Sequence, residues 1–388
     1  MIKNISVEEA LGIDSAVIVD VRSEGEYGDT TIPGAINVPL LNNEERARVG
    51  TVYKQVSPVA ARRLGMELIS PKLVELVNTI ETKAAPGKKV ILFCWRGGLR
   101  SQFVSYVLDL MGFDVYRING GYKAYRSCVN AYINESVLPH RAVVTHGLTG
   151  VGKTLVLREL LNMGMPVLDL EGLAVHRGSV YGKVGLPPSP TQKHFEALIF
   201  KELKRAEEKG IFLVECESRR LGRLLVPIPI MNAMKNGYRI LLYTSLEVRI
   251  RRSIEEYMAG MQDKDVVPQL MEATSALVRY LGNKKVEMLN SYIVQGQIDR
   301  AVEFLLVEYY DPLYKYPDRP APEYHLSVDT TDIKSAAEKI YGFVSGLAEY
   351  DVPVSGGVPI GNWEGPKGCK GIKGDLPGNC RREHQDTP

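Results

Sequence analysis

Cysteine is scarce in this chain, with five residues among 388, and the number is odd. A protein stabilised by disulfides would carry more cysteines in even number, so this usage favours a reducing compartment. The first residues are too polar for a signal peptide, and no apolar run approaches the roughly 18 residues that a membrane span requires. We therefore expect a cytoplasmic protein.

An excess of charge of either sign is also lacking. Lys and Arg number 48, Asp and Glu number 46, and the formal net charge is +2. Any site for a polyanion must therefore come from a local cluster of basic residues. The hydrophobic fraction of 45% and the charged fraction of 24% are typical of a globular protein, and the length is sufficient for two domains with separate cores.

The stretch FCWRGGLRSQ, residues 93–102, places a cysteine between an apolar run and a helical pattern. The apolar run predicts a buried strand, and Ser101 is placed to cap the helix that follows. Gly97 and Gly98 allow a loop whose N–H groups turn inward and can bind an anion. Such a loop and its arginines would favour the thiolate, so we predict a nucleophilic cysteine rather than a buried structural one. The candidate catalytic residues are Cys94, Arg96 and Arg100.

A second anion-binding loop is predicted at GLTGVGKT, residues 147–154. It follows an apolar strand pattern and precedes an amphipathic helix, the context that the G-x-x-x-x-G-K-[ST] P-loop requires. Glycine N–H groups would surround a diphosphate, Lys153 would neutralise it, and the Thr154 hydroxyl could hold a magnesium ion. The predicted diphosphate-binding residues are Gly147, Thr149, Gly150, Gly152, Lys153 and Thr154.

Carboxylates end two later apolar strands of the P-loop region. Asp169 and Glu215 occupy positions where a metal-organising carboxylate would lie, although a helix cap or a surface acid explains either residue equally well. His176 and Arg177 follow the first of these strands and are further candidates for the active cleft. For His176 the alternative is a hydrogen-bonded core histidine.

Four motifs in the first 130 residues resemble the rhodanese homology domain and occur in that family's order. Thr31 replaces the histidine that usually precedes the Ile-Pro-Gly-Ala segment. Five residues separate Cys94 from Arg100, one more than in thiosulfate-using rhodaneses and as many as in cysteine phosphatases, so the loop would suit a phosphate-like anion. The motifs are DVRSEGEY (20–27), IPGAINVPL (32–40), CWRGGLRS (94–101) and NGGYKAYR (119–126).

Further stretches resemble the tRNA 2-selenouridine synthase family, in which a rhodanese domain is joined to a P-loop domain. The resemblance covers about residues 10–350. It implies replacement of sulfur by selenium in the wobble 2-thiouridine of tRNA, with selenophosphate as donor, through an S-geranylated intermediate made from geranyl diphosphate. The stretches are LLNNEERARVGTVYKQ (40–55), DLEGLAVHRGSVYG (169–182), SPTQKHFEALI (189–199) and VECESRRLG (214–222).

The same resemblance implies roles and partners. The P-loop would hold geranyl diphosphate, and Cys94 would either take selenium as a perselenide or position selenophosphate. No tightly bound cofactor is expected, magnesium could assist at Thr154, and a selenophosphate synthetase is a candidate donor supplier. Local arginine clusters would bind tRNA, although each could be only a solvated face. The tRNA-binding candidates are Arg219, Arg220, Arg223, Arg249, Arg251 and Arg252.

We thus expect an α/β protein with a rhodanese-like domain over residues 1–135 and a P-loop NTPase-like, doubly wound parallel-sheet domain over residues 136–350. A Gly/Pro-rich tail over residues 351–388 is expected to be disordered, and its Cys369, Cys380 and His384 form an incomplete metal-ligand set. Two alternatives stay open: a cysteine phosphatase or sulfurtransferase coupled to a P-loop NTPase, and a binding protein with an inactive rhodanese domain.

Overall fold

The computed structural model describes residues 2–84, 88–135, 137–258 and 266–353. The chain divides into two compact units: unit 1 contains residues 1–133 and 191–200, and unit 2 contains the remainder. The tail predicted to be disordered lies outside the described residues from residue 354 onward, as do its two cysteines and its histidine. None of the helices in the described ranges is long and apolar enough to cross a membrane.

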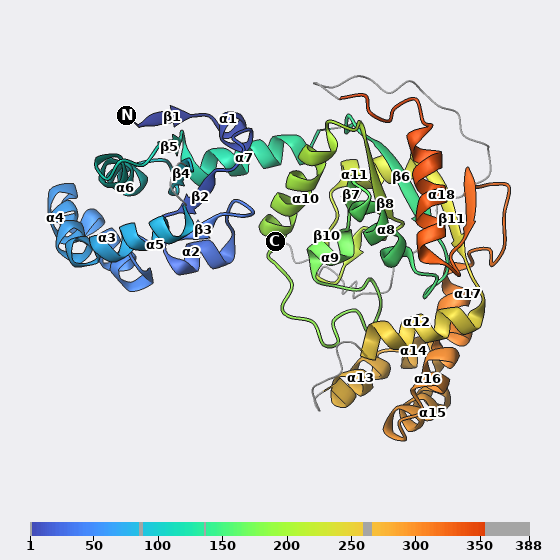
Figure 1. Cartoon of the computed structure of the whole chain (residues 1–388). Helices are drawn as coiled ribbons and strands as arrows, with labels where there is room; N and C mark the ends of the chain where they lie inside the picture. Colours follow the sequence, from blue (N-terminus) through green and yellow to red (C-terminus); the bar gives the residue numbers. More distant parts are fainter. Residues whose placement is uncertain (1, 85–87, 136, 259–265, 354–388) are drawn as a thin grey trace, which may run out of the picture. The chain divides into compact units, whose positions relative to one another are not determined.

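Unit 1 is built on a five-stranded sheet in the order β1-β5-β4-β2-β3, in which every neighbouring pair is parallel (Figure 1). All four residues of the central strand β4 are buried, as the apolar run before Cys94 predicts. Val19 and Asp20, at the end of β2, are buried as well. The strands are β1 (Lys3–Ile5), β2 (Val17–Asp20), β3 (Ile36–Asn37), β4 (Val90–Phe93) and β5 (Val115–Ile118).

Helices connect these strands, as a parallel sheet requires. The helix over Leu73–Lys83 buries Leu76, Val77 and Ile80 at helical spacing. The helices are α1 (Val7–Leu11), α2 (Glu24–Asp29), α3 (Asn43–Gln55), α4 (Pro58–Ile69), the 3₁₀ turn η1 (Ser70–Lys72), α5 (Leu73–Lys83), α6 (Leu99–Leu110) and α7 (Gly121–Ile133).

A buried ion pair lies at the end of β2. The Arg22 guanidinium is 2.6 Å from the Asp20 carboxylate, and both side chains are almost fully buried. Arg22 also donates to the Thr30 carbonyl oxygen at 2.6 Å and lies over the Tyr122 ring. Thr31, at the position where rhodaneses usually carry histidine, donates its hydroxyl to Asp20 at 2.9 Å. The pair therefore joins β2 to the segment before the Ile-Pro-Gly-Ala motif.

Residues 191–200 belong to unit 1 although they lie far along the chain. Glu196 forms an ion pair with Arg126 of α7, and the Phe200 ring packs edge-on against the Tyr132 ring of the same helix. The sequence-based boundary at residue 135 assigned this segment to the second domain. The difference arises because side-chain contacts, and not chain order, decide which core the segment joins.

Unit 2 contains a second five-stranded parallel sheet, in the order β12-β11-β6-β8-β7, and a separate two-stranded antiparallel hairpin. The predicted α/β fold with two parallel sheets is therefore confirmed. The strands are β6 (Arg141–His146), β7 (Val167–Leu168), β8 (Ile211–Glu215), β11 (Tyr238–Tyr243) and β12 (Leu326–Asp329), and the hairpin strands are β9 (Arg220–Leu221) and β10 (Leu224–Leu225).

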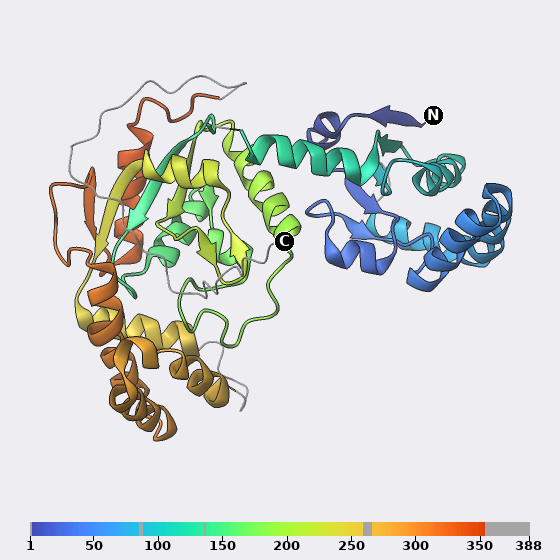
Figure 2. The ribbon, with the colours of Figure 1, turned by 180° about the vertical axis from the view of Figure 1, so that it is seen from behind.

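Two groups of helices complete unit 2. The first packs on the sheet, where α8 and α18 share one core with the strands. The second forms a helical cluster with its own core, drawn in yellow and orange beyond one end of the sheet (Figure 1 and Figure 2), and the sequence patterns did not indicate it. The helices are α8 (Lys153–Asn162), α9 (Leu170–Ala174), α10 (Gln192–Ala206), which begins in unit 1, α11 (Ile228–Lys235), α12 (Leu246–Met258), α13 (Val266–Ser275), α14 (Val278–Leu281), α15 (Asn283–Val294), α16 (Ile298–Leu305), the π-turn η2 (Leu306–Tyr310), α17 (Asp311–Tyr314) and α18 (Ile333–Ser345).

Removing one partner of the buried pair should destabilise unit 1 strongly. We expect Asp20→Ala to lower its free energy of unfolding by about 3–5 kcal/mol, because Arg22 would keep a buried, unpaired charge. The matched control is Asp114→Ala, which breaks the exposed pair with Lys3 and should cost less than about 1 kcal/mol. Labelling of the Cys94 thiol in increasing urea, read by peptide mass spectrometry, measures both values, and equal costs would contradict the prediction.

Candidate functional site

Cys94 follows β4 directly and is 3% exposed. The Ser101 hydroxyl donates to the Cys94 sulfur at 3.3 Å and also lies 3.2 Å from the Gly98 carbonyl oxygen. The expectation that Ser101 caps the following helix is wrong, because α6 begins one residue after Gly98, which is its N-cap. Ser101 lies in the first helical turn instead, where its hydroxyl can reach back to position the sulfur.

The turn before α7 fixes the shape of the Cys94 loop. Gly121 has a φ of +58°, and a Cβ atom there would lie 2.2 Å from the Cys94 carbonyl oxygen. The N–H groups of Tyr122 and Lys123 donate to the carbonyl oxygens of Cys94 and Trp95, at 2.8 and 2.9 Å. Within the described parts of the chain, the N–H groups of residues 95–98 donate to no protein acceptor. The loop thus leaves several donors for an anion beside the sulfur.

The two arginines of the loop differ in their surroundings. Arg96 is exposed. Arg100 binds Glu26 of α2 through both terminal nitrogens, at 2.7 and 3.3 Å, so much of its charge is already compensated. Burial acts to raise the pKa of Glu26, but the hydrogen bonds and the charge of Arg100 outweigh it and hold that pKa below its ordinary value. Arg46 of α3 approaches the same carboxylate at 3.6 Å.

The P-loop joins β6 to α8, as the sequence predicts. Gly147 has a φ of +147°, and a Cβ atom there would lie 2.3 Å from the Leu242 carbonyl oxygen of the neighbouring strand. The Lys153 ammonium lies over the loop, 3.3 Å from the Gly147 carbonyl oxygen. Thr154 donates its hydroxyl to the Glu215 carboxylate at 2.7 Å. The loop therefore places a cation, a hydroxyl and a carboxylate at the carboxyl edge of the sheet.

Two arginines predicted to bind tRNA instead donate hydrogen bonds to backbone carbonyl oxygens of the P-loop. The side chains of Arg249 and Arg252 are 4% and 8% exposed. Arg249 donates to the Thr149 carbonyl oxygen at 2.8 Å and pairs with Asp311, and Arg252 donates to the Val151 carbonyl oxygen at 2.9 Å. We correct the interpretation of these two residues, since neither offers its charge at the surface.

The other predicted tRNA contacts lie at the surface and stay predictions. Arg219, Arg220 and Arg223 are exposed in and around the β9–β10 hairpin. The Arg251 side chain is 64% exposed and 4.0 Å from Glu255 on the same helix.

Three residues proposed for the active cleft are held by local bonds. Asp169 accepts from the Gly172 N–H at 2.8 Å and is the N-cap of α9, which is the capping alternative considered for it. The His176 ring accepts from the Gly178 N–H at 3.0 Å, and burial lowers its pKa. Arg177 donates to the Val184 carbonyl oxygen at 2.8 Å. The Asp169 contact caps the start of α9, and the His176 and Arg177 contacts stabilise the turn after that helix.

Comparisons with known proteins agree on both units. A family model described as the tRNA 2-selenouridine synthase AAA domain matches residues 140–334, and one described as a rhodanese-like domain matches residues 5–128. The tRNA 2-selenouridine synthase of Pseudomonas syringae pv. syringae (strain B728a) is 34% identical over 342 residues, which cover 81% of this chain and 92% of that protein. The chain belongs to the tRNA 2-selenouridine synthase family.

A second relative carries the same name, and a solved structure matches the first part of the chain. The tRNA 2-selenouridine synthase of Azotobacter vinelandii (strain DJ / ATCC BAA-1303) is 33% identical over 333 residues, covering 79% of this chain and 89% of that one. A solved N-terminal domain from Clostridium difficile 630 is 39% identical, covers 33% of this chain and 98% of its own length, and has a TM-score of 0.32.

The structure adds two acids to the site of this synthase-family chain. One carboxylate oxygen each of Glu171, Glu215 and Glu217 lies within 4.8 Å of the others. Glu215 and Glu217 are two residues apart at the end of β8, whereas Glu171 comes from α9. The sequence contained part of this information, because alternate residues of a strand lie on one face and Glu215 and Glu217 could therefore be expected to lie close together. Nothing in the sequence placed Glu171 beside them. We call these three residues the acid trio.

The acid trio is crowded, with Glu215 buried and Glu171 and Glu217 half-buried, and this raises the pKa values of its carboxyl groups. Burial raises the pKa of Glu215 to about 7, against the opposing charge of Lys153. Burial, reinforced by the charges of its two partners, raises the pKa of Glu171 well above its usual range, and burial raises that of Glu217. Clustered carboxylate oxygens beside the Thr154 hydroxyl are the ligands that a hard divalent cation prefers. The residues present therefore fit a magnesium ion.

A cavity of about 470 Å³ opens beside the P-loop at the carboxyl ends of β11 and β12. Leu148 of the P-loop contributes to its wall, and three aspartates make its lining acidic. Its lining residues are Leu148, Tyr243, Thr244, Ser245, Leu246, Arg249, Asp311, Asp318 and Asp329.

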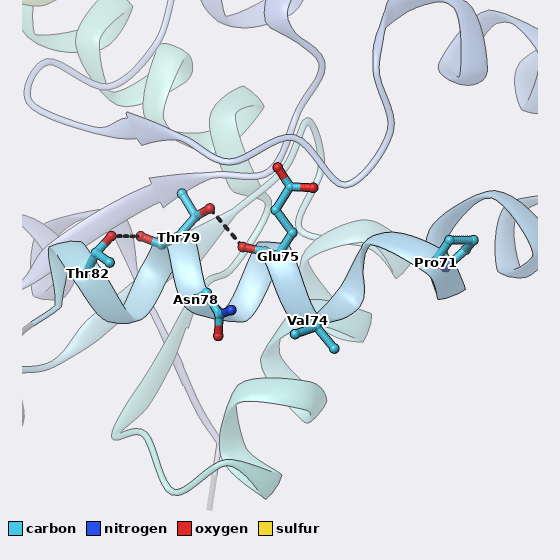
Figure 3. Close-up of a pocket in the computed structure, with 6 residues that line it drawn as sticks. All are labelled: Pro71, Val74, Glu75, Asn78, Thr79 and Thr82. Atoms are coloured by element: carbon cyan, nitrogen blue, oxygen red, sulfur yellow. Dashed lines mark hydrogen bonds between the residues drawn. The ribbon is translucent and has the colours of Figure 1, made fainter.

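Figure 3 shows a second hollow, of about 460 Å³, on α5 and the turn before it in unit 1. The Thr79 and Thr82 hydroxyls donate to carbonyl oxygens of their own helix. The hollow contains none of the predicted site residues, so we do not assign it to the site. It is lined by Pro71, Val74, Glu75, Asn78, Thr79 and Thr82.

The acid trio should make unit 2 less stable at high pH. Folded-state pKa values above the unfolded ones mean that the folded protein retains protons, so in a chelating buffer the free energy of unfolding falls as the pH rises from about 4.5 through about 7. We expect Glu217→Gln to flatten this decline and to add about 1 kcal/mol or more of stability at pH 8. Urea denaturation at several pH values measures the free energy of unfolding of both proteins. The control Glu287→Gln, at an exposed position, should change nothing, and an unchanged profile for Glu217→Gln would contradict the prediction.

Proposed function

We propose that this protein replaces sulfur by selenium in the wobble 2-thiouridine of tRNA, with selenophosphate as the selenium donor and an S-geranylated nucleoside as the intermediate. The observation that carries the proposal is the presence, in one synthase-family chain, of two separate anion-binding loops. One contains a buried cysteine and the other a lysine, a hydroxyl and buried carboxylates. Two phosphorus-containing donors need two such loops.

The P-loop supports the alkylation half of the reaction. The thiocarbonyl sulfur attacks the first carbon of geranyl diphosphate, so an S–C bond forms, the C–O bond to diphosphate breaks, and the N3 proton of the base passes to solvent. Lys153 and the loop N–H groups would stabilise the charge that develops on the leaving diphosphate. This role needs no hydrolysis of a nucleotide.

A magnesium ion would fit this half-reaction. Thr154 and Glu215, which are already hydrogen-bonded, would hold it together with the neighbouring acids of the trio. When bound, the ion would neutralise part of the diphosphate charge. The residues of the chain then bind and orient the diphosphate, and Lys153 remains its direct counter-charge.

The Cys94 loop supports the selenation half. Alkylation converts a poor leaving group into a thioether-like one. Selenium of selenophosphate can then attack C2 of the base, geranylthiol leaves, and water cleaves the Se–P bond to release phosphate. This sequence balances without an oxidant, whereas a perselenide on Cys94 would require oxidation of selenium. We therefore favour a positioning role for Cys94, with the free N–H groups of residues 95–98 around the selenophosphate.

Two apolar side chains beside Cys94 suit the proposed intermediate. Trp95 is 41% exposed and Leu99 is 63% exposed, and they flank a polar, anion-binding loop. Contact with the geranyl chain would cover this apolar surface. A loop that handled only inorganic anions would have no use for it.

A cysteine phosphatase is a weaker candidate for the same loop. Its arginine would bind the phosphate oxygens directly, but Arg100 is engaged by Glu26 through two hydrogen bonds. A selenophosphate synthetase would be the natural supplier of the selenium donor, because the proposed reaction consumes one selenophosphate for each nucleoside.

The two half-reactions should be separable by mutation. Lys153→Ala removes the charge that balances the diphosphate, so it should slow geranylation about a hundredfold or more. The same variant should still selenate tRNA that has already been geranylated. Cys94→Ala leaves the P-loop intact, so geranylated tRNA should accumulate. Mass spectrometry of nucleosides from thiolated tRNA, incubated with geranyl diphosphate and selenophosphate, measures both steps.

The matched control is Cys128→Ala, which removes a partly exposed thiol of α7 outside both loops and should leave both steps unchanged. If Cys94→Ala abolished geranylation while the protein stayed folded and bound tRNA, the division of labour between the loops would be wrong. If the unaltered protein produced neither nucleoside, the proposed function itself would fail.

A further inference from the structure

The hairpin formed by α3 and α4 supplies no residue to either anion-binding loop. Its two helices pack against each other, and α3 contains no buried residue. The α4 helix buries Ala61, Gly65 and Ile69 on one side and leaves its other side to solvent. A helical pair with so much free surface suggests a role in binding.

Both helices of this hairpin carry exposed basic side chains. Across the described parts of the chain, none of the four lies within ion-pair distance of a carboxylate, and all are exposed. On α4, two of them share one face with the exposed residues Val59 and Met66, at spacings of three and four. The four residues, which we call the basic hairpin residues, are Arg48, Lys54, Arg62 and Arg63.

Glu26 connects the base of the hairpin to the Cys94 loop. Its carboxylate binds Arg100 of the loop at 2.7 Å and lies 3.6 Å from Arg46, in the first turn of α3. Since α3 has 13 residues, it extends about 20 Å from this point. The basic hairpin residues therefore lie along a helical pair whose first turn shares the Glu26 carboxylate with Arg100 of the Cys94 loop.

The tip of the hairpin is apolar and aromatic. Tyr53 is 58% exposed, Val56 is 71% exposed and Val59 is 72% exposed. Exposed aromatic rings beside basic side chains are the combination that binds unpaired bases and their phosphates together. A purely solvated face would not require exposed tyrosine and valine at the turn.

We propose that the α3–α4 hairpin is a docking surface for tRNA, in which the basic hairpin residues bind backbone phosphates and Tyr53 stacks on an unpaired base. The identity of the RNA rests on the proposed function. Charge complementarity favours RNA as the occupant, because the chain as a whole has a net charge of only +2 and must bind a polyanion through a local surface. Two of the six arginines predicted to bind tRNA, Arg249 and Arg252, are buried. Fewer exposed arginines are therefore available outside the hairpin for phosphate contacts.

The experiment measures tRNA affinity against salt for Arg62→Gln/Arg63→Gln in the full chain. Loss of two phosphate contacts should weaken binding about tenfold near 0.1 M salt and reduce the slope of log K against log salt by about 1.5. Tyr53→Ala should also weaken binding several-fold but leave the slope unchanged, because stacking releases no counterions. Filter binding or fluorescence anisotropy with thiolated tRNA gives these values.

The matched control is Lys334→Gln/Lys339→Gln, which removes two exposed charges from α18. Equal loss of affinity in this control, or unchanged affinity and slope in the Arg62/Arg63 variant, would overturn the proposal and assign the hairpin to another partner. An unaltered protein that binds no tRNA would overturn it as well. If the protein bound tRNA through the hairpin but modified no nucleoside, the proposed function would fail and the docking surface would stand.

Discussion

The P-loop depends on two buried arginines that bind its backbone carbonyl oxygens from outside. Arg249 and Arg252 reach Thr149 and Val151 from α12, and Asp311 compensates the charge of Arg249. Three glycines of the loop, Gly147, Gly150 and Gly152, have positive φ and contribute no side chain that could fix the shape of the backbone. Donors from a neighbouring helix supply that constraint, and they bind carbonyl oxygens rather than the N–H groups that a diphosphate would need.

Charge is balanced differently at the two loops. At the P-loop, Lys153 lies near the acid trio, whose carboxylate oxygens lie within 4.8 Å of one another, and burial and crowding raise the pKa values of these carboxyls. At the Cys94 loop, the charge of Arg100 is already compensated by Glu26. The first site therefore suits a cation and a polyanionic leaving group, whereas the second offers mainly backbone N–H groups and a sulfur atom to a smaller anion.

The Glu26 carboxylate connects two parts of unit 1. It binds Arg100 of the Cys94 loop and lies close to Arg46 in the first turn of α3, so it fixes the position of the α3–α4 hairpin relative to the loop. A docking surface is useful to an enzyme only if its position relative to the reacting group is defined. The same ion-pair arrangement that supports the loop defines that position within unit 1.

The sequence alone determined both loops, their order, the parallel α/β sheets and the family, because strand-loop-helix patterns and motif spacings are local properties of the chain. The tertiary structure alone decided that Arg249 and Arg252 are buried while Arg251 is exposed, that Glu171 joins Glu215 and Glu217, and that residues 191–200 belong to unit 1. Each of these facts depends on partners distant in sequence, such as Thr149 for Arg249 and Arg126 for Glu196. Periodicity in the sequence predicts on which face of its own helix or strand a side chain lies. The carbonyl, carboxylate or ring that the side chain contacts there is determined only by the packing of the whole fold.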